Sequence, residues 1–161
     1  MTELVKYVDV MIANEEDSKD VFGIEAEGTD IETGKLSEAG YRDLARKLAA
    51  TFGAKKVAFT LRESFSANDN NWSALLYDAA SDTAIRSRQY AIRIVDRVGG
   101  GDSFGGGLIY ALLNGYSDED AINFAAAASA LKHTIEGDFN RVSLEEVRAL
   151  MGGSASGRVQ R

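Results

Sequence analysis

The stretch 96-DRVGGGDSFGGGLIYALLNG-115 decides the interpretation of this sequence, because it joins a glycine-rich segment to an apolar one. Six of the twelve residues from 96 to 107 are glycine. Apolar residues then recur every four positions, at Phe104, Leu108 and Leu112, which predicts a helix over 103–115 with one buried face. The preceding segment 91–96 is apolar and β-branched, so the region predicts a strand, a glycine-rich turn and a helix.

A glycine-rich turn at the start of a helix can bind an anion. The first N–H groups of the helix have no intrahelical acceptor and lie at the positive end of the helix dipole, and glycine leaves room for a ligand to approach. Two interpretations of Gly99, Gly100 and Gly101 stand side by side: an anion site, or a tight turn alone. The glycines at 105–107 lie inside the predicted helix, at a cost of roughly 1 kcal/mol each relative to alanine, and indicate close packing against a neighbour.

Two widespread phosphate-binding motifs are absent from this turn. No lysine follows the glycines, which excludes GxxxxGK[ST], and position 104 is phenylalanine, which breaks GxGxxG. An acid, Asp102, instead accompanies the glycines on the first helical turn. A carboxylate beside an anion site suits the removal of a proton from a hydroxyl while a phosphoryl group arrives.

The rest of the chain predicts one α/β domain over residues 1–151 and a loose tail over 152–161. A helix capped by Asn14 follows the first strand, Ser37 and Gly53 bound an amphipathic helix, and Ser143 with Glu146 forms a capping box. A hairpin is expected around 79–82. The predicted strands are 8–13, 55–61, 72–78 and parts of 83–96, the further helices are 14–23, 37–53 and 117–134, and 62–71 is expected to be a polar loop.

Composition narrows the function classes. The 161 residues carry a formal charge of −7, which argues against nucleic-acid binding through a broad basic face. Cysteine is absent, so disulfides and thiolate metal sites are excluded, and the single histidine, His133, excludes a histidine cluster. No signal peptide or membrane span is evident, which predicts a soluble, cytoplasmic protein. Lys132 and His133 stand near a helix end, and we interpret them as structural.

Four segments, taken in order, resemble the ribokinase/PfkB carbohydrate kinases. VGGGDSF (98–104) resembles the second signature of that family, usually written with a G-A-G-D core. TLRES (60–64), DRVG (96–99) and KHTIEGDFN (132–140) look most like the 2-keto-3-deoxygluconate kinases within it. The resemblance implies a ribokinase-like three-layer α/β/α fold, of which this chain matches the C-terminal, nucleotide-binding half. It is carried by the segments ANEED (13–17), TLRES (60–64), VDRVGGGDSFGGGLIYALL (95–113) and ALKHTIEGDFN (130–140).

The resemblance implies a role for each residue of the glycine turn. Asp102 would be the catalytic base that deprotonates the attacking sugar hydroxyl. The backbone N–H groups of Gly99, Gly100, Gly101 and Asp102 would stabilise the charge on the γ-phosphate of ATP.

Nucleotide contacts are implied elsewhere in the chain. Thr60, Arg62 and Ser64 stand in the segment that covers the nucleotide in relatives. Ala126 and Ala130 would form part of the wall of the adenine pocket, and simple helix packing is an equally good interpretation of these two alanines.

Cation sites are also implied by the resemblance. Asn14 and Asp17 correspond to an Asn-x-x-Glu motif that organises Mg²⁺ and phosphate, although from local sequence alone a helix cap is the better interpretation. Asp96 and Val98 match positions at which relatives bind a monovalent cation such as K⁺. Arg97 departs from the threonine that is commoner there.

Three functional hypotheses follow. The first is an ATP-dependent kinase for 2-keto-3-deoxygluconate, with fructose or ribose as rival substrates. The second is a half-domain that binds nucleotide without catalysis, since the family's N-terminal half, with most of the sugar pocket, has no counterpart here. The third is a dinucleotide-dependent oxidoreductase, against which the missing GxGxxG counts. The expected partners are ATP and a sugar acid, and an exposed sheet edge would invite a second copy of the chain.

Overall fold

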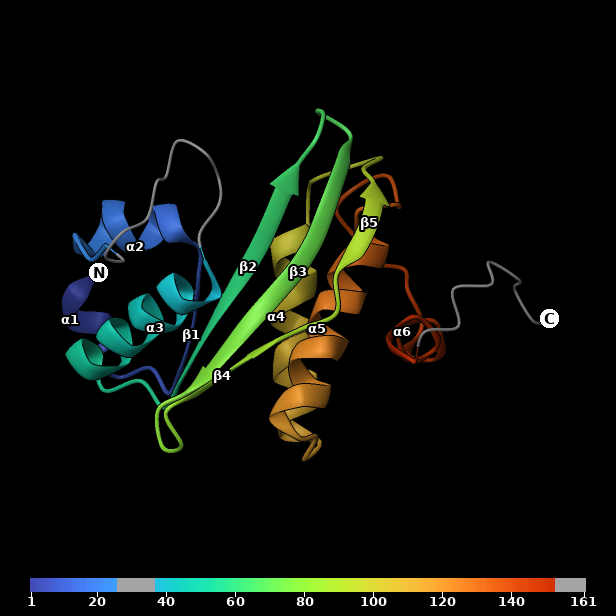
Figure 1. Cartoon of the computed structure of the whole chain (residues 1–161). Helices are drawn as coiled ribbons and strands as arrows, with labels where there is room; N and C mark the ends of the chain where they lie inside the picture. The colour runs from blue at the N-terminus through green and yellow to red at the C-terminus, as the bar shows by residue number, and fades with distance from the viewer. Residues whose placement is uncertain (26–36, 153–161) are drawn as a thin grey trace. The chain divides into compact units, whose positions relative to one another are not determined.

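The computed structural model describes residues 1–25 and 37–152 (Figure 1). The chain divides into two compact units. The first contains residues 1–63 and 74–86, and the second contains residues 64–73 and those from 87 onward. The tail predicted at 152–161 lies, apart from its first residue, outside the described residues.

The chain combines helices with parallel and antiparallel strands, which confirms the predicted α/β class. In order, the elements are α1 (Thr2–Val5), β1 (Val10–Ala13), α2 (Glu15–Phe22), α3 (Glu38–Phe52), β2 (Lys56–Ser64), β3 (Asp69–Asp78), β4 (Thr83–Arg86), β5 (Tyr90–Arg93), α4 (Gly100–Leu113), α5 (Asp118–Lys132) and α6 (Leu144–Met151). Within the described residues, none of the helices combines the length and the apolarity needed to span a bilayer.

The strands of the first unit follow the order β1-β2-β3-β4. β1 and β2 are parallel, with Val10 opposite Lys56. The second half of β3 pairs antiparallel with β4, with Leu75 opposite Arg86, which confirms the predicted hairpin. Its turn contains Asp82 at φ 50°, a left-handed conformation that aspartate tolerates better than most residues.

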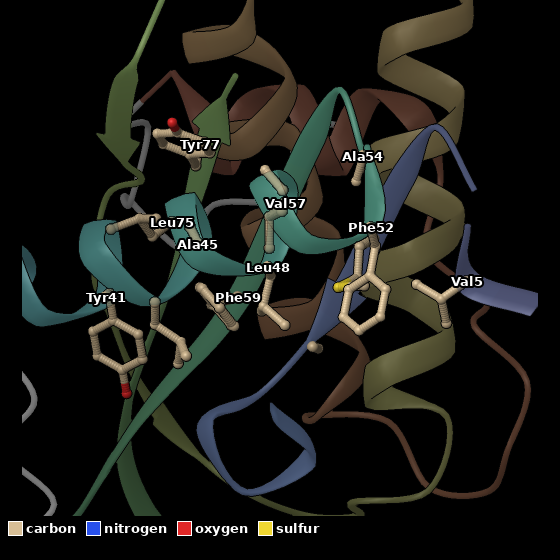
Figure 2. Packing of buried hydrophobic residues seen from close by; sticks show 14 of the residues in the cluster. Val5, Tyr41, Ala45, Leu48, Phe52, Ala54, Val57, Phe59, Leu75 and Tyr77 are labelled. Atoms are coloured by element: carbon tan, nitrogen blue, oxygen red, sulfur yellow. The ribbon is translucent and has the colours of Figure 1, made fainter. Parts of the chain in front are cut away.

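The core of the first unit forms between α3 and the strands (Figure 2). Leu44 and Leu48, four residues apart on α3, are almost completely buried together with Phe59 of β2. The Tyr41 and Phe59 rings lie 5.6 Å apart. Each large apolar side chain buried in this way contributes about 1.5–3 kcal/mol, so the amphipathic pattern of α3 holds this unit together.

The predicted helix caps are confirmed. Ser37 accepts the Gly40 N–H, and Gly53 ends α3 in the left-handed conformation. Asn14 and Asp17 form a reciprocal capping box at the start of α2. Ser143 and Glu146 do the same for α6, as predicted.

The polar loop predicted at 62–71 is wrong. β2 continues to Ser64 and β3 begins at Asp69, which leaves only a short turn. The N–H groups of Phe65 and Ser66 both donate to the Asp69 carbonyl, and the Ser66 hydroxyl accepts the Asp69 N–H at 2.9 Å. These polar residues therefore build a hairpin, which needs no apolar side chains at its exposed end.

In the second unit, β5 pairs antiparallel with the first half of β3, with Trp72 opposite Tyr90. Trp72, Ile92, Ile94 and Ala130 form a buried cluster. α4 and α5 pack side by side (Figure 1). α4 begins at Gly100 rather than at the predicted residue 103, so two of the glycines belong to its first turn.

The half-buried ion pair Lys56–Asp78 gives a prediction for the first unit. The Ser81 hydroxyl and the Lys56 ammonium, at 2.7 and 2.9 Å, lower the pKa of the Asp78 carboxyl. We expect Asp78→Asn to lower the free energy of unfolding at neutral pH by about 1–2 kcal/mol. A depressed carboxyl pKa stabilises above the ordinary value of 3.8, so in urea unfolding the difference should shrink as pH falls below it.

The matched control is the exposed pair of Asp9 with Lys55, whose side chains are 71% and 77% accessible. Solvent screens such a pair, so Asp9→Asn should leave stability almost unchanged. An equal loss of unfolding free energy in Asp78→Asn and Asp9→Asn would contradict a stabilising role of the Lys56–Asp78 pair.

Candidate functional site

The glycine turn of the second unit needs glycine at its first position for two reasons. Gly99, the residue before α4, has φ 77°, which L side chains rarely adopt. A Cβ at Gly99 would also clash with the Asp138 carbonyl oxygen and would lie 3.2 Å from Lys132 Cε. The chain from 132 to 138 therefore lies directly against this turn.

Gly100 attaches the turn to the end of α5. It is buried, and a Cβ there would lie 2.6 Å from Cε1 of His133. The Gly100 carbonyl accepts a 2.8 Å hydrogen bond from the Ser129 hydroxyl. The His133 ring is itself held, with Nδ1 2.7 Å from the Ser129 carbonyl oxygen and the ring 4.6 Å from that of Trp72. These contacts fix where the first turn of α4 points.

The N–H groups of the turn differ in how they are used. The Gly100 N–H donates to the Arg97 carbonyl at a long 3.3 Å. Neither the Gly101 N–H nor the Asp102 N–H has an acceptor among residues 1–25 and 37–152. Asp102 is exposed, and its carboxylate likewise has no partner in the described part of the chain. The turn thus presents unpaired donors next to a carboxylate, the arrangement expected from the sequence.

A pocket of about 610 Å³ opens at this turn, a size suited to a small-molecule ligand. It is lined by Gly99, Asp102, Ser103, Gly106, Gly107, Tyr110, Phe124, Ala128, Asp138, Phe139, Asn140, Val142, Leu144 and Val147. A Cβ at Gly107 would lie 3.2 Å from the Ala125 Cα, which confirms close helix packing there, whereas a Cβ at Gly106 would meet nothing within 4 Å.

The pocket has a polar end and an aromatic end. At the polar end, beside the glycine turn, the Asn140 amide donates to the Ser103 hydroxyl at 2.6 Å. At the other end the Tyr110 and Phe124 rings stack with centroids 5.3 Å apart. Phe139 also lines the pocket and is 80% exposed. Such a pocket can hold a molecule with an anionic group and a flat apolar group.

The predicted residues of the turn and of α5 fall in different places. Gly99 and Asp102 line the pocket, and Gly100 lies behind it against His133. Ala126 and Ala130 are buried, and Ala130 belongs to the cluster around Trp72. Their positions fit helix packing, the alternative left open for them. Phe124 and Ala128 are the residues of α5 that face the pocket.

The residues predicted to cover the nucleotide are split between the units. Thr60 and Arg62 lie on β2 in the first unit, half-buried and exposed respectively. Ser64 belongs to the second unit, where its hydroxyl donates to Asn70 Oδ1 at 2.6 Å. Their roles stay predictions.

Asn14 and Asp17, predicted to organise Mg²⁺, lie in the first unit and cap α2. Asn14 Oδ1 accepts the Asp17 N–H at 2.7 Å, and Asp17 Oδ2 accepts the Asn14 N–H at 3.2 Å. The described residues contain no group of three or more acids, histidines or cysteines that could form a metal cage. Mg²⁺ often arrives with substrate phosphates and needs only one or two carboxylates, so the second oxygen of Asp17 is compatible with it.

Asp96, predicted as a cation ligand, binds backbone N–H groups with both carboxylate oxygens, and its cation role stays a prediction. Its Oδ1 accepts the Val98 N–H at 3.0 Å and its Oδ2 accepts the Gly137 N–H at 2.9 Å. These two bonds lower the pKa of the Asp96 carboxyl, and the charge of Lys132 adds to the effect. Asp96 thereby ties the segment before the glycine turn to the segment after α5.

Sequence reasoning assigned no site role to Tyr110, Phe124, Phe139 and Asn140, although all line the pocket. Residues 137–142 stand between two helices without apolar periodicity, which marks a loop but not what the loop faces. Gly137 at φ 83° is the local signal that this loop turns sharply.

The second unit thus joins a glycine turn to an exposed acid at one end of a pocket, within an α/β architecture. Residues 1–142 match the profile of the pfkB family carbohydrate kinases. The chain belongs to this family, as the resemblance indicated.

Two relatives act on 2-keto-3-deoxy sugar acids by name. The structure of 2-dehydro-3-deoxygluconokinase from Thermotoga maritima is similar with a TM-score of 0.86 and 45% identity, over 94% of this chain and 44% of that one. The 2-dehydro-3-deoxygalactonokinase of Haloferax volcanii is 30% identical over 149 residues, 92% of this chain and 40% of that protein.

A ribokinase structure from Thermotoga maritima is similar with a TM-score of 0.65 and 25% identity, over 94% of this chain and 45% of that one. The ribokinase-like α/β fold is thereby confirmed. The chain spans less than half the length of each of these three relatives.

The surroundings of Gly100 and Gly101 predict opposite effects of one substitution. Gly100→Ala forces the His133 ring to move and should lower the free energy of unfolding by about 1–3 kcal/mol. Gly101→Ala places its Cβ in open space within a helix and should raise it by up to about 1 kcal/mol. Urea unfolding of the two variants measures both. A stability loss in both would show that the turn does not have this geometry.

Proposed function

We propose that this chain binds ATP in the pocket of the second unit, with the phosphates at the glycine turn. We further propose that it carries the catalytic base of a kinase for 2-keto-3-deoxygluconate, also called 2-dehydro-3-deoxygluconate. The observation that carries the proposal concerns the N–H groups of Gly101 and Asp102, which have no acceptor within residues 1–25 and 37–152. They stand next to the carboxylate of Asp102, a residue that lines the pocket. Similarity to kinases of 2-keto-3-deoxy sugar acids supports the substrate class.

The proposed reaction needs three things from the turn. The Asp102 carboxylate accepts the proton of the sugar hydroxyl as its oxygen attacks the γ-phosphorus of ATP. The bond from that phosphorus to the bridging oxygen breaks, and ADP keeps the electron pair. The N–H groups of Gly101 and Asp102 donate to the oxygens of the transferred group, where negative charge must be held during transfer. The dipole of α4 acts in the same direction.

The aromatic end of the pocket provides a surface for the base. The apolar side chains of α6 and the loop before it, with Phe139 and the stacked Tyr110, offer flat contacts that a purine can use. Asn140, at the polar end, donates to the Ser103 hydroxyl, so we expect it to fix the loop beside the phosphates.

Magnesium would supply charge neutralisation of the phosphates. Asn14 and Asp17, in the first unit, stay the residues predicted to organise Mg²⁺, and the capping box uses only one carboxylate oxygen of Asp17. Since ATP is supplied in the cytoplasm, we keep the expectation of a cytoplasmic protein.

A second function, nucleotide binding without catalysis, is favoured by one observation. The chain spans 44% of the Thermotoga kinase, and a base and an anion site need a positioned sugar to reach a useful rate. In that case ATP would bind to this chain, but no sugar would stimulate ADP release.

The nucleotide site is tested by a pair of substitutions that differ only in charge. Gly101→Asp places a carboxylate among the phosphate-binding N–H groups, whereas Gly101→Asn has the same size and is neutral. We expect Gly101→Asp to weaken Mg-ATP binding by at least about tenfold, equivalent to about 1.4 kcal/mol, and Gly101→Asn to weaken it less. Isothermal titration calorimetry measures both. Equal affinities of the two variants would refute the placement of the phosphates.

The catalytic role is tested separately. Asp102→Asn should leave Mg-ATP affinity within a few-fold and lower sugar-dependent ADP release by about 100-fold or more. The assay compares 2-keto-3-deoxygluconate with fructose and ribose. Stimulation by fructose or ribose alone would overturn the substrate assignment. ATP binding with no stimulation by any sugar would support the second function.

A further inference from the structure

Lys132, the last residue of α5, is completely buried. Burying an ammonium group is costly unless oxygen atoms and negative charge surround it. Compensating interactions must therefore surround Lys132, which has no role in the proposed kinase reaction.

The surroundings of Lys132 bring three chain segments together. Its Nζ donates to the Ile135 carbonyl at 3.2 Å. Its Cε lies 3.2 Å from the position of a Cβ on Gly99, so the side chain runs along the glycine turn. Its charge acts on Asp96, whose carboxylate binds the Val98 and Gly137 N–H groups. Lys132 thus interacts with three segments: the one before the turn, the turn itself and the loop after α5.

The predicted monovalent cation does not fit these residues. Asp96, the one acid predicted to bind it, already accepts a backbone N–H on each carboxylate oxygen. The nearby Ile135 carbonyl accepts the lysine ammonium. A second positive charge beside Asp96 would be repelled by that ammonium. The Asp96 carboxylate and the Ile135 carbonyl therefore suit the ammonium of a lysine in the chain better than a metal ion that can dissociate.

We propose that Lys132 is a built-in cation that replaces a monovalent metal ion and positions the glycine turn. Its ammonium donates to the Ile135 carbonyl and so orders the loop at 135–138, against which Gly99 packs, and its charge favours the ionised form of Asp96. It contacts no substrate atom in this account and is a positioning residue. The effect on nucleotide affinity rests on the proposed function, but the effect on stability does not.

The wild-type chain provides the first test. Its melting temperature and its Mg-ATP affinity are compared in potassium chloride, sodium chloride and N-methyl-D-glucamine chloride at a fixed ionic strength of about 0.1 M. We expect the same melting temperature in all three salts and a Kd constant within about twofold. A specific rise of the melting temperature with K⁺ would overturn the proposal, whether or not ATP binds.

Lys132→Met provides the second test, since it keeps the length and apolarity of the side chain and removes the charge. This variant should melt lower than wild type in N-methyl-D-glucamine chloride and recover part of the loss in potassium or ammonium chloride. Lys6→Met, at an exposed ion pair, is the matched control and should respond to no cation. A Lys132→Met loss that neither K⁺ nor NH₄⁺ reduces would overturn the replacement. If this variant does not fold in any salt, the wild-type comparison decides.

Discussion

The second unit depends on the joint between the start of α4 and the end of α5. The Ser129 hydroxyl holds the Gly100 carbonyl, the His133 ring covers the face of Gly100, and Gly99 turns through a left-handed conformation against the Asp138 carbonyl. The N–H and carbonyl groups of Gly100 are used on the inner side of the turn, whereas the N–H groups of Gly101 and Asp102 have no acceptor within the described residues. Further along the same helix pair, Gly107 lets α4 approach Ala125, which sets the floor of the pocket. The contacts that pack α4 against α5 therefore also shape the candidate site.

Electrostatics works in the same direction. The N-terminus of α4 is already the positive end of a dipole, and Lys132 adds a full positive charge beside the turn. The charge of Lys132 favours the ionised form of Asp96, whose carboxylate accepts the Val98 and Gly137 N–H groups. The turn is therefore held without using the N–H groups of Gly101 and Asp102. A built-in cation would make the geometry independent of the salt around the protein. It would also join residues 96–99 and 132–138, which lie far apart in the sequence.

Local patterns were enough to predict much of the fold, and long-range contacts explain most of what they missed. A few neighbouring residues determine each helix cap and the amphipathic face of α3. The caps at Asn14, Ser37 and Ser143 and this face were all confirmed. The hairpin at 65–68 was missed because most residues from 62 to 71 are polar, a pattern that loops share. On α5 the alanines are apolar on nearly every face, so spacing does not show that Phe124 and Ala128, rather than Ala126 and Ala130, face the pocket. The burial of Lys132 depends on Gly99 and Asp96, which no local pattern connects to it.

The central claim is that an anionic ligand lies on the outer side of the glycine turn. It is tested most directly by titrating the ¹⁵N-labelled chain with Mg-ATP, and then with tripolyphosphate, while following the backbone amides by NMR. We expect the largest changes in amide chemical shift at Gly101 and Asp102 with both ligands, and further changes at Tyr110 and Phe139 with ATP alone. Gly100, whose N–H is already used, should move less. Shifts concentrated away from this turn, or no shifts at all in a folded chain, would contradict the account.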